Sequence, residues 1–169
     1  LSVREHRNQM ATLYAQFSEI AASNEVAWAR EPLAAEFIRE HSPRNKMLAF
    51  PYTKLHNSQW NVDQAAGLIF CSVAVAQELK IPRSQWLFPL ASTESNAMSV
   101  VSARKELHRS HGFAIAGRVA LALAGKRIED VDLLELYSCF PLAVRVQLQE
   151  LGIAASRELS VTGGMTFGG

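Results

Sequence analysis

The sequence predicts an α/β fold in which helices pack on a layered mixed sheet. Hydrophobic residues make up 49% of the 169 positions, which is enough to bury a core. In the second half of the chain, short apolar runs typical of strands alternate with longer stretches typical of helices. This order favours strands joined by helical crossovers, with functional loops at the carboxyl ends of the strands.

The first part of the chain is expected to be mostly helical. Apolar residues recur at three- and four-residue spacing over residues 3–23, which predicts an amphipathic helix whose opposite, solvated face carries arginine and glutamate side chains. A shorter helix is predicted over residues 32–39, with Pro32 in its first turn. Residues 47–54 read as extended but contain Pro51, so we expect an edge strand or irregular structure there.

The rest of the chain alternates between expected strands and helices. Residues 67–71 form a continuous apolar run that suits a strand buried on both faces, which would place Cys71 in the core. Ser72 is a suitable cap for a helix over residues 73–79. The remaining expected elements are strands over residues 86–90, 131–136 and 159–162, and helices over residues 110–124 and 141–151.

Composition and charge exclude several classes of function. The formal net charge is +1, so there is no general electrostatic drive toward nucleic acid or anionic membranes, and we expect neither as a partner. The longest nearly unbroken apolar run, residues 65–76, is shorter than the span of about 18 residues that a membrane helix needs. Two cysteines cannot form a disulfide framework, which favours a reducing, cytoplasmic location.

The sequence holds no strong metal signal. His108 and His111 are three residues apart and could share a helix face, but two imidazoles without a third nearby ligand are a weak pattern. We therefore expect no metal site. The sequence stops in a glycine-rich loop directly after an expected strand, and from this we expect it to be part of a longer protein.

Cys139 is the leading candidate for chemistry. It follows the strand expected over residues 131–136, and Pro141 opens the next helix. A thiol in that position lies near free backbone N–H groups and the positive end of a helix dipole, and both favour the thiolate form. Such a thiol serves as a nucleophile or a proton donor. The alternative is a buried structural cysteine, a common role for this residue.

Other polar and glycine positions give weaker signals. His56 precedes Asn57 and is a candidate for lining a pocket, although a hydrogen-bonded loop histidine fits the same pattern. Gly163 and Gly164 supply backbone that could approach a thioester or a phosphate, and they fit a plain tight turn equally well.

Three segments resemble the thiolase superfamily. The run His-Asn-Ser-Gln-Trp-Asn-Val-Asp-Gln-Ala-Ala at residues 56–66 matches the spacing of a family segment that reads GNAS, three residues, then DGAA. Residues 137–140, Tyr-Ser-Cys-Phe, share their last two letters with the HDCF loop of the sterol-carrier-protein type of thiolase. Residues 163–164 match a GG turn that precedes the family's GHP loop. The segments also resemble thiolase-like proteins of the acetyl-CoA acetyltransferase kind.

The resemblance implies a partial thiolase-like fold and a function. Residues 1–85 would be the later part of the N-terminal half, and residues 86–169 the first part of the C-terminal half, which is truncated. The activity implied is acyl transfer or 3-ketoacyl cleavage, with a coenzyme A thioester as substrate and no bound cofactor. Lipid metabolism and a homo-oligomer or a complex of thiolase-like subunits are implied in the same way.

The site residues carry over only in part. Cys139 matches the cysteine thought to supply the acid/base thiol in the sterol-carrier-protein type. Tyr137 stands where the family has an oxyanion-hole asparagine or histidine, and its phenol can donate one hydrogen bond. His56, Asn57, Gly163 and Gly164 would contact the substrate.

The family's nucleophilic cysteine and its GHP histidine have no counterpart in these 169 residues. We therefore predict that the 169 residues alone have no thiolase activity. The alternative function is a non-catalytic thiolase-like subunit that binds acyl-CoA or scaffolds a partner.

Overall fold

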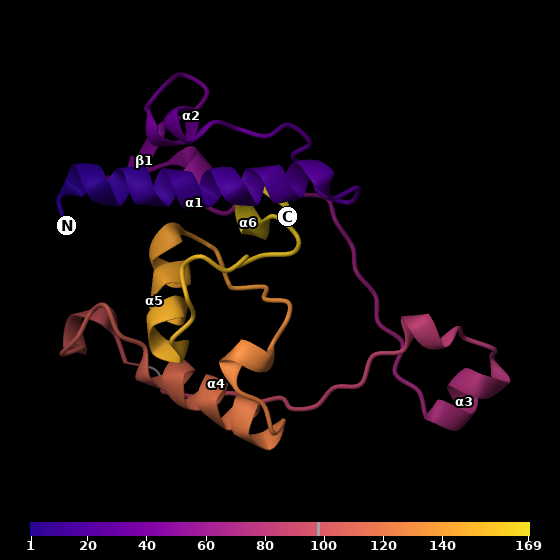
Figure 1. The fold of residues 1–169 in the computed structure, drawn as a ribbon. Helices are drawn as coiled ribbons and strands as arrows, with labels where there is room; N and C mark the ends of the chain where they lie inside the picture. The colour runs from indigo at the N-terminus through magenta and orange to yellow at the C-terminus, as the bar shows by residue number, and fades with distance from the viewer. Residues whose placement is uncertain (98) are drawn as a thin grey trace.

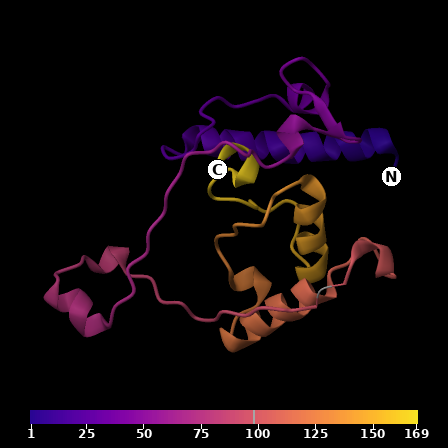
Figure 2. The same ribbon diagram turned by 180° about the vertical axis from the view of Figure 1, so that it is seen from behind.

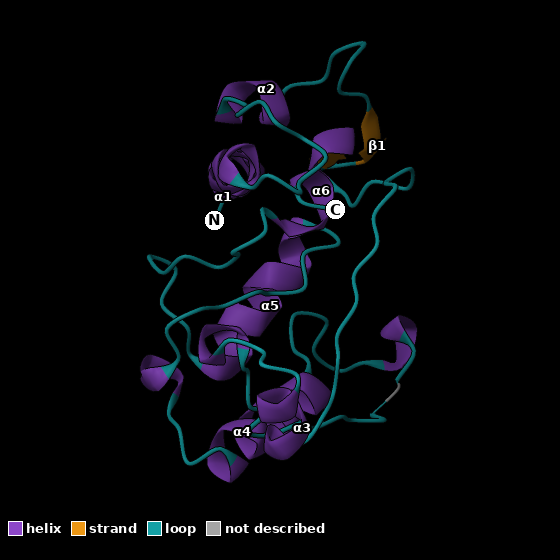
Figure 3. Ribbon diagram, turned by 90° about the vertical axis from the view of Figure 1, so that its right-hand side faces the viewer, coloured by secondary structure: helices purple, strands orange, loops and turns teal. Residues whose placement is uncertain are grey.

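A computed structural model describes residues 1–97 and 99–169, and one long helix, α1 (Val3–Ser23), organises it. α1 begins where the Ser2 hydroxyl accepts the Glu5 amide and the Glu5 carboxylate accepts the Ser2 amide. Seen along α1, the short helix α2 (Ala35–Arg39) lies on one side of it and α5 (Pro141–Leu151) on the other (Figure 3). The helix predicted over residues 3–23 is therefore confirmed.

The core lies along the predicted apolar face of α1. Tyr14 and Phe17 are fully buried, with ring centroids 5.5 Å apart. Phe167 from α6 (Gly164–Phe167) packs edge-on against Tyr14 at 6.3 Å. The buried residues that contact this cluster come from distant parts of the chain and include Ala11, Ala21, Ala27, Ile38, Leu134, Leu136, Val144, Ile153 and Leu159. α1 therefore joins the two halves of the sequence.

Residues 47–54 form a small hairpin. β1 (Met47–Ala49) pairs antiparallel with β2 (Tyr52–Thr53), and a cis peptide bond joins Phe50 to Pro51 in the turn. The expected interruption at Pro51 is confirmed, since Pro51 separates two very short strands.

The other predicted helices occur close to their expected bounds. α3 (Val73–Glu78) begins at Ser72, whose hydroxyl accepts the Val75 amide at 3.2 Å. α4 (His111–Leu123) is followed by Gly125, and α5 ends at Gly152 with φ of 67°. The 3₁₀ turns are η1 (Lys54–His56), η2 (Arg83–Gln85), η3 (Val101–Ala103) and η4 (Ile128–Asp130). None of the described helices has both the length and the hydrophobicity needed to cross a membrane.

None of the strands predicted after residue 54 is formed among the described residues. Within the described residues, the only sheet is the hairpin of β1 and β2. Residues 67–71 run out to α3, which stands apart from the rest of the chain on two extended arms (Figures 1 and 2). Ile69 is 86% exposed, and Cys71 is exposed too. The prediction that Cys71 lies in the core is therefore wrong, because a strand buried on both faces needs paired strands beside it and none lies there among the described residues.

Two of these extended segments do lie side by side. The Leu136 amide donates to the Leu159 carbonyl at 3.1 Å, and the Glu135 carboxylate accepts the amides of Val161 and Thr162 at 2.8 and 3.0 Å. A side chain thus takes backbone donors that a neighbouring strand would take in a ladder. The chain has helices and a small sheet, as an α/β fold does, whereas the expected layering is not seen.

Ser160 holds the glycine-rich turn that follows. Its hydroxyl donates to Glu135 and accepts the amides of Gly163 and Gly164, each at 2.9 Å. The turn then passes into α6, where a glycine-rich loop was expected. Gly163 has φ of 99°, and a Cβ there would lie 2.4 Å from the Ala21 Cβ of α1. Glycine is thus required where this turn meets α1.

Helices α4 and α5 are joined by a buried carboxylate. The Glu150 side chain has no exposed surface and accepts from Arg109 Nε at 2.8 Å, from Arg109 Nη2 at 2.9 Å and from the Ser110 amide at 2.7 Å. These hydrogen bonds, that from Arg109 first, lower the pKa of Glu150 from an ordinary value of 4.5 to about 2.

We expect Gly163→Ala to destabilise the protein by about 3 kcal/mol, because an alanine is strained at positive φ and its Cβ overlaps α1. The measurement is the free energy of unfolding in urea. Gly67→Ala is the matched control, since a Cβ there meets nothing within 4 Å, and it should change stability by less than about 0.5 kcal/mol. Equal effects of the two substitutions would show that the turn does not pack on α1.

Glu150 should make stability depend on pH in the acid range. Because its pKa is lower in the folded chain than in the unfolded chain, its contribution is complete above about pH 5 and is lost as the pH falls toward 2. Glu150→Gln should cost about 1–3 kcal/mol at pH 7 and progressively less at lower pH. Urea unfolding of both proteins at pH 7, 4 and 3 tests this, and a difference that stays constant with pH would contradict it.

Candidate functional site

The three motif segments of the sequence meet beneath α1. The Ser58 amide donates to the Cys139 carbonyl at 2.9 Å, which joins the loop after η1 to the loop before α5. The Met165 amide donates to the Ser138 hydroxyl at 3.0 Å, and the Thr166 hydroxyl donates to the Asn57 carbonyl at 3.0 Å. These contacts bring together segments that lie up to 109 residues apart in the sequence.

Cys139 lies at the end of an extended segment and directly before α5. It is half-buried, Phe140 is the N-cap of α5, and Pro141 is the first residue of that helix. The predicted place just before a helix is therefore confirmed, whereas the predicted strand over residues 131–136 is not formed among the described residues. The other cysteine of the chain, Cys71, directly precedes Ser72, the N-cap of α3.

Tyr137 is held by its backbone, while its side chain is exposed. The Gln147 amide group donates to the Tyr137 carbonyl at 2.7 Å and accepts the Tyr137 amide at 3.1 Å, so α5 fixes the main chain in both directions. Tyr137 as a whole is 60% exposed. The Cys139 side chain, by hydrogen bonding and then by its charge, raises the pKa of Tyr137 above 10. The phenol therefore keeps its proton and can donate it in a hydrogen bond.

Tyr14 fixes the same loop from inside. Its hydroxyl donates to the Ser138 carbonyl at 3.0 Å, across 124 residues of sequence. Burial, followed by the charges of Cys139 and Tyr52, raises the pKa of Tyr14. The hydroxyl is thus a permanent donor to the peptide that precedes Cys139.

His56 lies in the interior between two tyrosine rings. It is 1% exposed, and its ring centroid lies 5.7 Å from that of Tyr14 and 5.9 Å from that of Tyr52. Its Nδ1 accepts the Thr53 amide at 3.2 Å, so the proton of the neutral ring is on Nε2. Burial, and then the charges of Arg7 and His6, lower the pKa of His56 to about 4. This geometry fits the interpretation of His56 as a hydrogen-bonded loop histidine. Contact between His56 and a substrate stays a prediction.

The remaining candidate residues shape the turns around Cys139. The Asn57 side chain donates to the Thr53 carbonyl at 2.7 Å. Gly164 has φ of 68°, and a Cβ there would lie 2.8 Å from the Ser138 hydroxyl and 2.9 Å from the Phe17 ring. Gly163 and Gly164 thus let the turn approach both α1 and the Cys139 loop, and a direct role for either in substrate binding stays a prediction.

Two surface cavities, of about 410 and 450 Å³, have neither Cys139 nor Tyr137 among their lining residues. Among the described residues, no three histidine, cysteine, aspartate or glutamate side chains gather as metal ligands would. The arrangement at Cys139 offers a thiol, an exposed phenol and fixed main-chain groups, which suit acid–base chemistry.

Sequence reasoning missed the residues that support the site. The apolar spacing over residues 3–23 accounts for Tyr14 only as a core residue, and no local pattern identifies the partners of Gln147 or Ser160. The one sequence signal for such a supporting residue is a polar side chain within an apolar helix pattern, as Gln147 is in α5. Its partner, the Tyr137 carbonyl ten residues away, is visible only in the structure.

Comparisons with known proteins agree with this geometry. A family described as thiolase C-terminal domain-like matches residues 93–162. An acetyl-CoA acetyltransferase of Methanocaldococcus jannaschii is 26% identical over 157 residues, which cover 93% of this chain and 36% of that protein.

A solved structure described as a monomeric SCP2-thiolase like protein type 1 from Mycobacterium smegmatis matches all of this chain and 37% of its own length. The identity is 30% and the TM-score 0.83. The chain thus spans little more than a third of either relative. Together with the meeting of the three motif segments, these findings show that the chain is a thiolase-like chain of the SCP2 type.

Proposed function

We propose that this chain forms part of the acyl-CoA site of a thiolase-like acyltransferase, in which Cys139 transfers protons and Tyr137 supports the thioester oxygen. The observation that carries the proposal is the meeting of the three motif segments at Cys139, fixed by the Ser58, Met165 and Thr166 hydrogen bonds. The likeness to an acetyl-CoA acetyltransferase and to an SCP2-thiolase like protein supports the same reaction class.

The proposed chemistry needs two groups with different roles. The Cys139 thiolate removes a proton from the carbon next to the thioester carbonyl, and the electron pair moves onto the carbonyl oxygen. The Tyr137 hydroxyl, which keeps its proton, donates a hydrogen bond to that oxygen as charge develops. In this scheme Cys139 is not the nucleophile that receives an acyl group. We therefore expect the 169 residues alone to transfer no acyl group.

The second candidate is a non-catalytic thiolase-like subunit that binds acyl-CoA or scaffolds a partner. The observation that favours it is the exposed phenol of Tyr137 at a position where the thiolase pattern has an asparagine or a histidine. A phenol offers one donor on a longer arm than an asparagine amide does, so the geometry of an oxyanion hole would differ.

The finer features of the fold belong to the same proposal. The extended segments at residues 67–71, 86–90, 131–136 and 159–162 would be strands of a layered mixed sheet when neighbouring strands are supplied. Residues 1–85 and 86–169 would then belong to two halves of a thiolase fold. We further propose a cytoplasmic protein of lipid metabolism that acts on coenzyme A thioesters without a bound cofactor and assembles as an oligomer.

The acid–base role predicts loss of proton exchange from acetyl-CoA in Cys139→Ser. In deuterated buffer, the full-length protein should exchange the methyl protons of acetyl-CoA, measured by the decay of their NMR signal. Cys139→Ser should slow the decay about 10²- to 10⁴-fold, because a hydroxyl is far less readily ionised than a thiol. Tyr137→Phe should slow it about 10²-fold, because the oxyanion donor is lost.

Cys71→Ser is the matched control, since Cys71 is the other cysteine of the chain and takes no part in the hydrogen bonds that join the three motif segments. It should exchange the methyl protons at the wild-type rate. Equal rates for Cys139→Ser and the wild type would refute the acid–base role. Binding of acetyl-CoA by calorimetry without any exchange would instead establish the non-catalytic subunit.

A further inference from the structure

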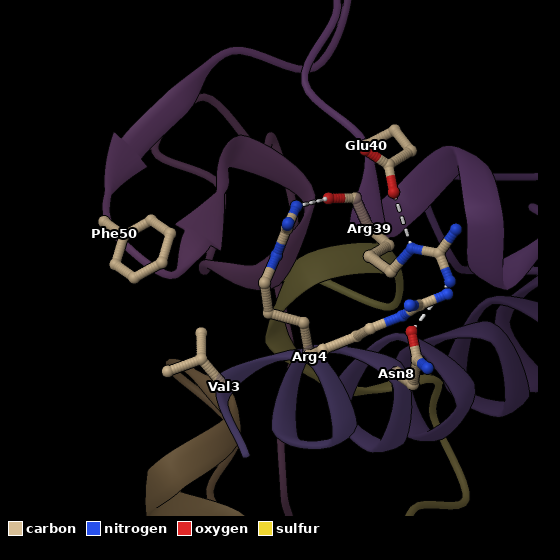
Figure 4. A pocket seen from close by; sticks show the side chains of 7 residues that line it. Val3, Arg4, Asn8, Arg39, Glu40 and Phe50 are labelled. Atoms are coloured by element: carbon tan, nitrogen blue, oxygen red, sulfur yellow. Dashed lines mark hydrogen bonds and ion pairs between the residues drawn. The ribbon is translucent and has the colours of Figure 1, made fainter.

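A group of arginines gathers at the start of α1, away from the Cys139 loop. Arg4 and Arg7 from α1 and Arg39 from the end of α2 line one cavity of about 410 Å³. Figure 4 shows this cavity, with Phe50 of the hairpin turn and Val3 along one border. The helix pattern predicts a solvated charged face here, but the structure brings α2 and the hairpin over it.

The cavity carries an excess of positive charge. Glu40 is the one carboxylate among its lining residues, against three guanidinium groups. Glu40 accepts from Arg39 Nε at 2.6 Å, and that hydrogen bond lowers the pKa of Glu40, so the carboxylate is ionised at neutral pH. Two positive charges therefore remain unbalanced within the cavity.

Several of the guanidinium donors have no acceptor. One terminal nitrogen of Arg7 donates to the Arg39 carbonyl at 2.6 Å, but Arg7 Nε is buried and has no hydrogen-bond partner in the described chain. Arg39 donates to Asn8 at 2.7 Å. Arg4 has no hydrogen bond or ion pair with any described residue. A buried, charged donor without an acceptor costs free energy. Arg4 is exposed, so its guanidinium donors are open to a ligand in the cavity.

We propose that this cavity binds the phosphate group of an anionic ligand. A phosphate presents several oxygens with up to two negative charges, which matches the unbalanced charge and donors of three guanidinium groups. Phe50, which is 69% exposed, and Val3 give an apolar border for the remainder of an organic phosphate. The inference needs only these residues and is independent of the chemistry proposed at Cys139.

The test is calorimetric titration of the full chain with pyrophosphate and with ADP at about 0.15 M salt, where weak surface attraction is screened. Wild-type protein should bind both saturably. Arg4→Gln should weaken binding about tenfold, because a charge-assisted hydrogen bond is lost, and it removes no contact that the fold uses. Glu40→Gln should tighten binding several-fold, because the competing carboxylate is gone.

Lys126→Gln is the matched control, since it removes one positive charge in the segment after α4, on the far side of α5 from α1 (Figure 1). It should leave both affinities unchanged. If ADP binds more tightly than pyrophosphate, and Phe50→Ser weakens the binding of ADP, the ligand is an organic phosphate. If the two bind equally tightly, the cavity recognises the phosphate group alone. Absence of saturable binding by the wild type, or equal weakening in Arg4→Gln and Lys126→Gln, would overturn the proposal.

Discussion

The position of Cys139 depends on the buried peptide that precedes it. Ser138 is fully buried, its carbonyl accepts the Tyr14 hydroxyl, and its own hydroxyl accepts the Met165 amide. The Cys139 carbonyl accepts the Ser58 amide from the third segment. Each of these groups would cost free energy if it were buried without a partner, so the three segments are stable only together. The backbone on both sides of the Ser138–Cys139 peptide is therefore held by distant segments at this junction, although it lies in a loop.

Close approach makes that junction possible. Gly163 packs against the backbone of α1, and Gly164 lies between Ser138 and Phe17, both at positive φ. Any side chain at these two positions would push the turn away from α1 and open the hydrogen bonds around Ser138. The aromatic core under α1 and the polar contacts at Cys139 thus depend on the same two glycines, which links packing to the candidate chemistry.

The sequence predicted what is encoded locally. The helix over residues 3–23 follows from the spacing of Tyr14 and Phe17, and the end of α5 follows from Gly152. The strands were less predictable, because an apolar run such as residues 67–71 pairs only if neighbouring strands are present. In the site, Cys139 was found from its place between a strand-like run and Pro141, whereas the Tyr14–Ser138 contact spans 124 residues and left no local pattern.

The junction can be tested by amide hydrogen exchange followed by NMR. If the Tyr14 hydroxyl holds the Cys139 loop, the Ser58 and Met165 amides are protected in the wild type, and both lose protection in Tyr14→Phe while the amides of α1 keep theirs. Rapid exchange of Ser58 and Met165 in the wild type would contradict this, as would protection that is unchanged in Tyr14→Phe.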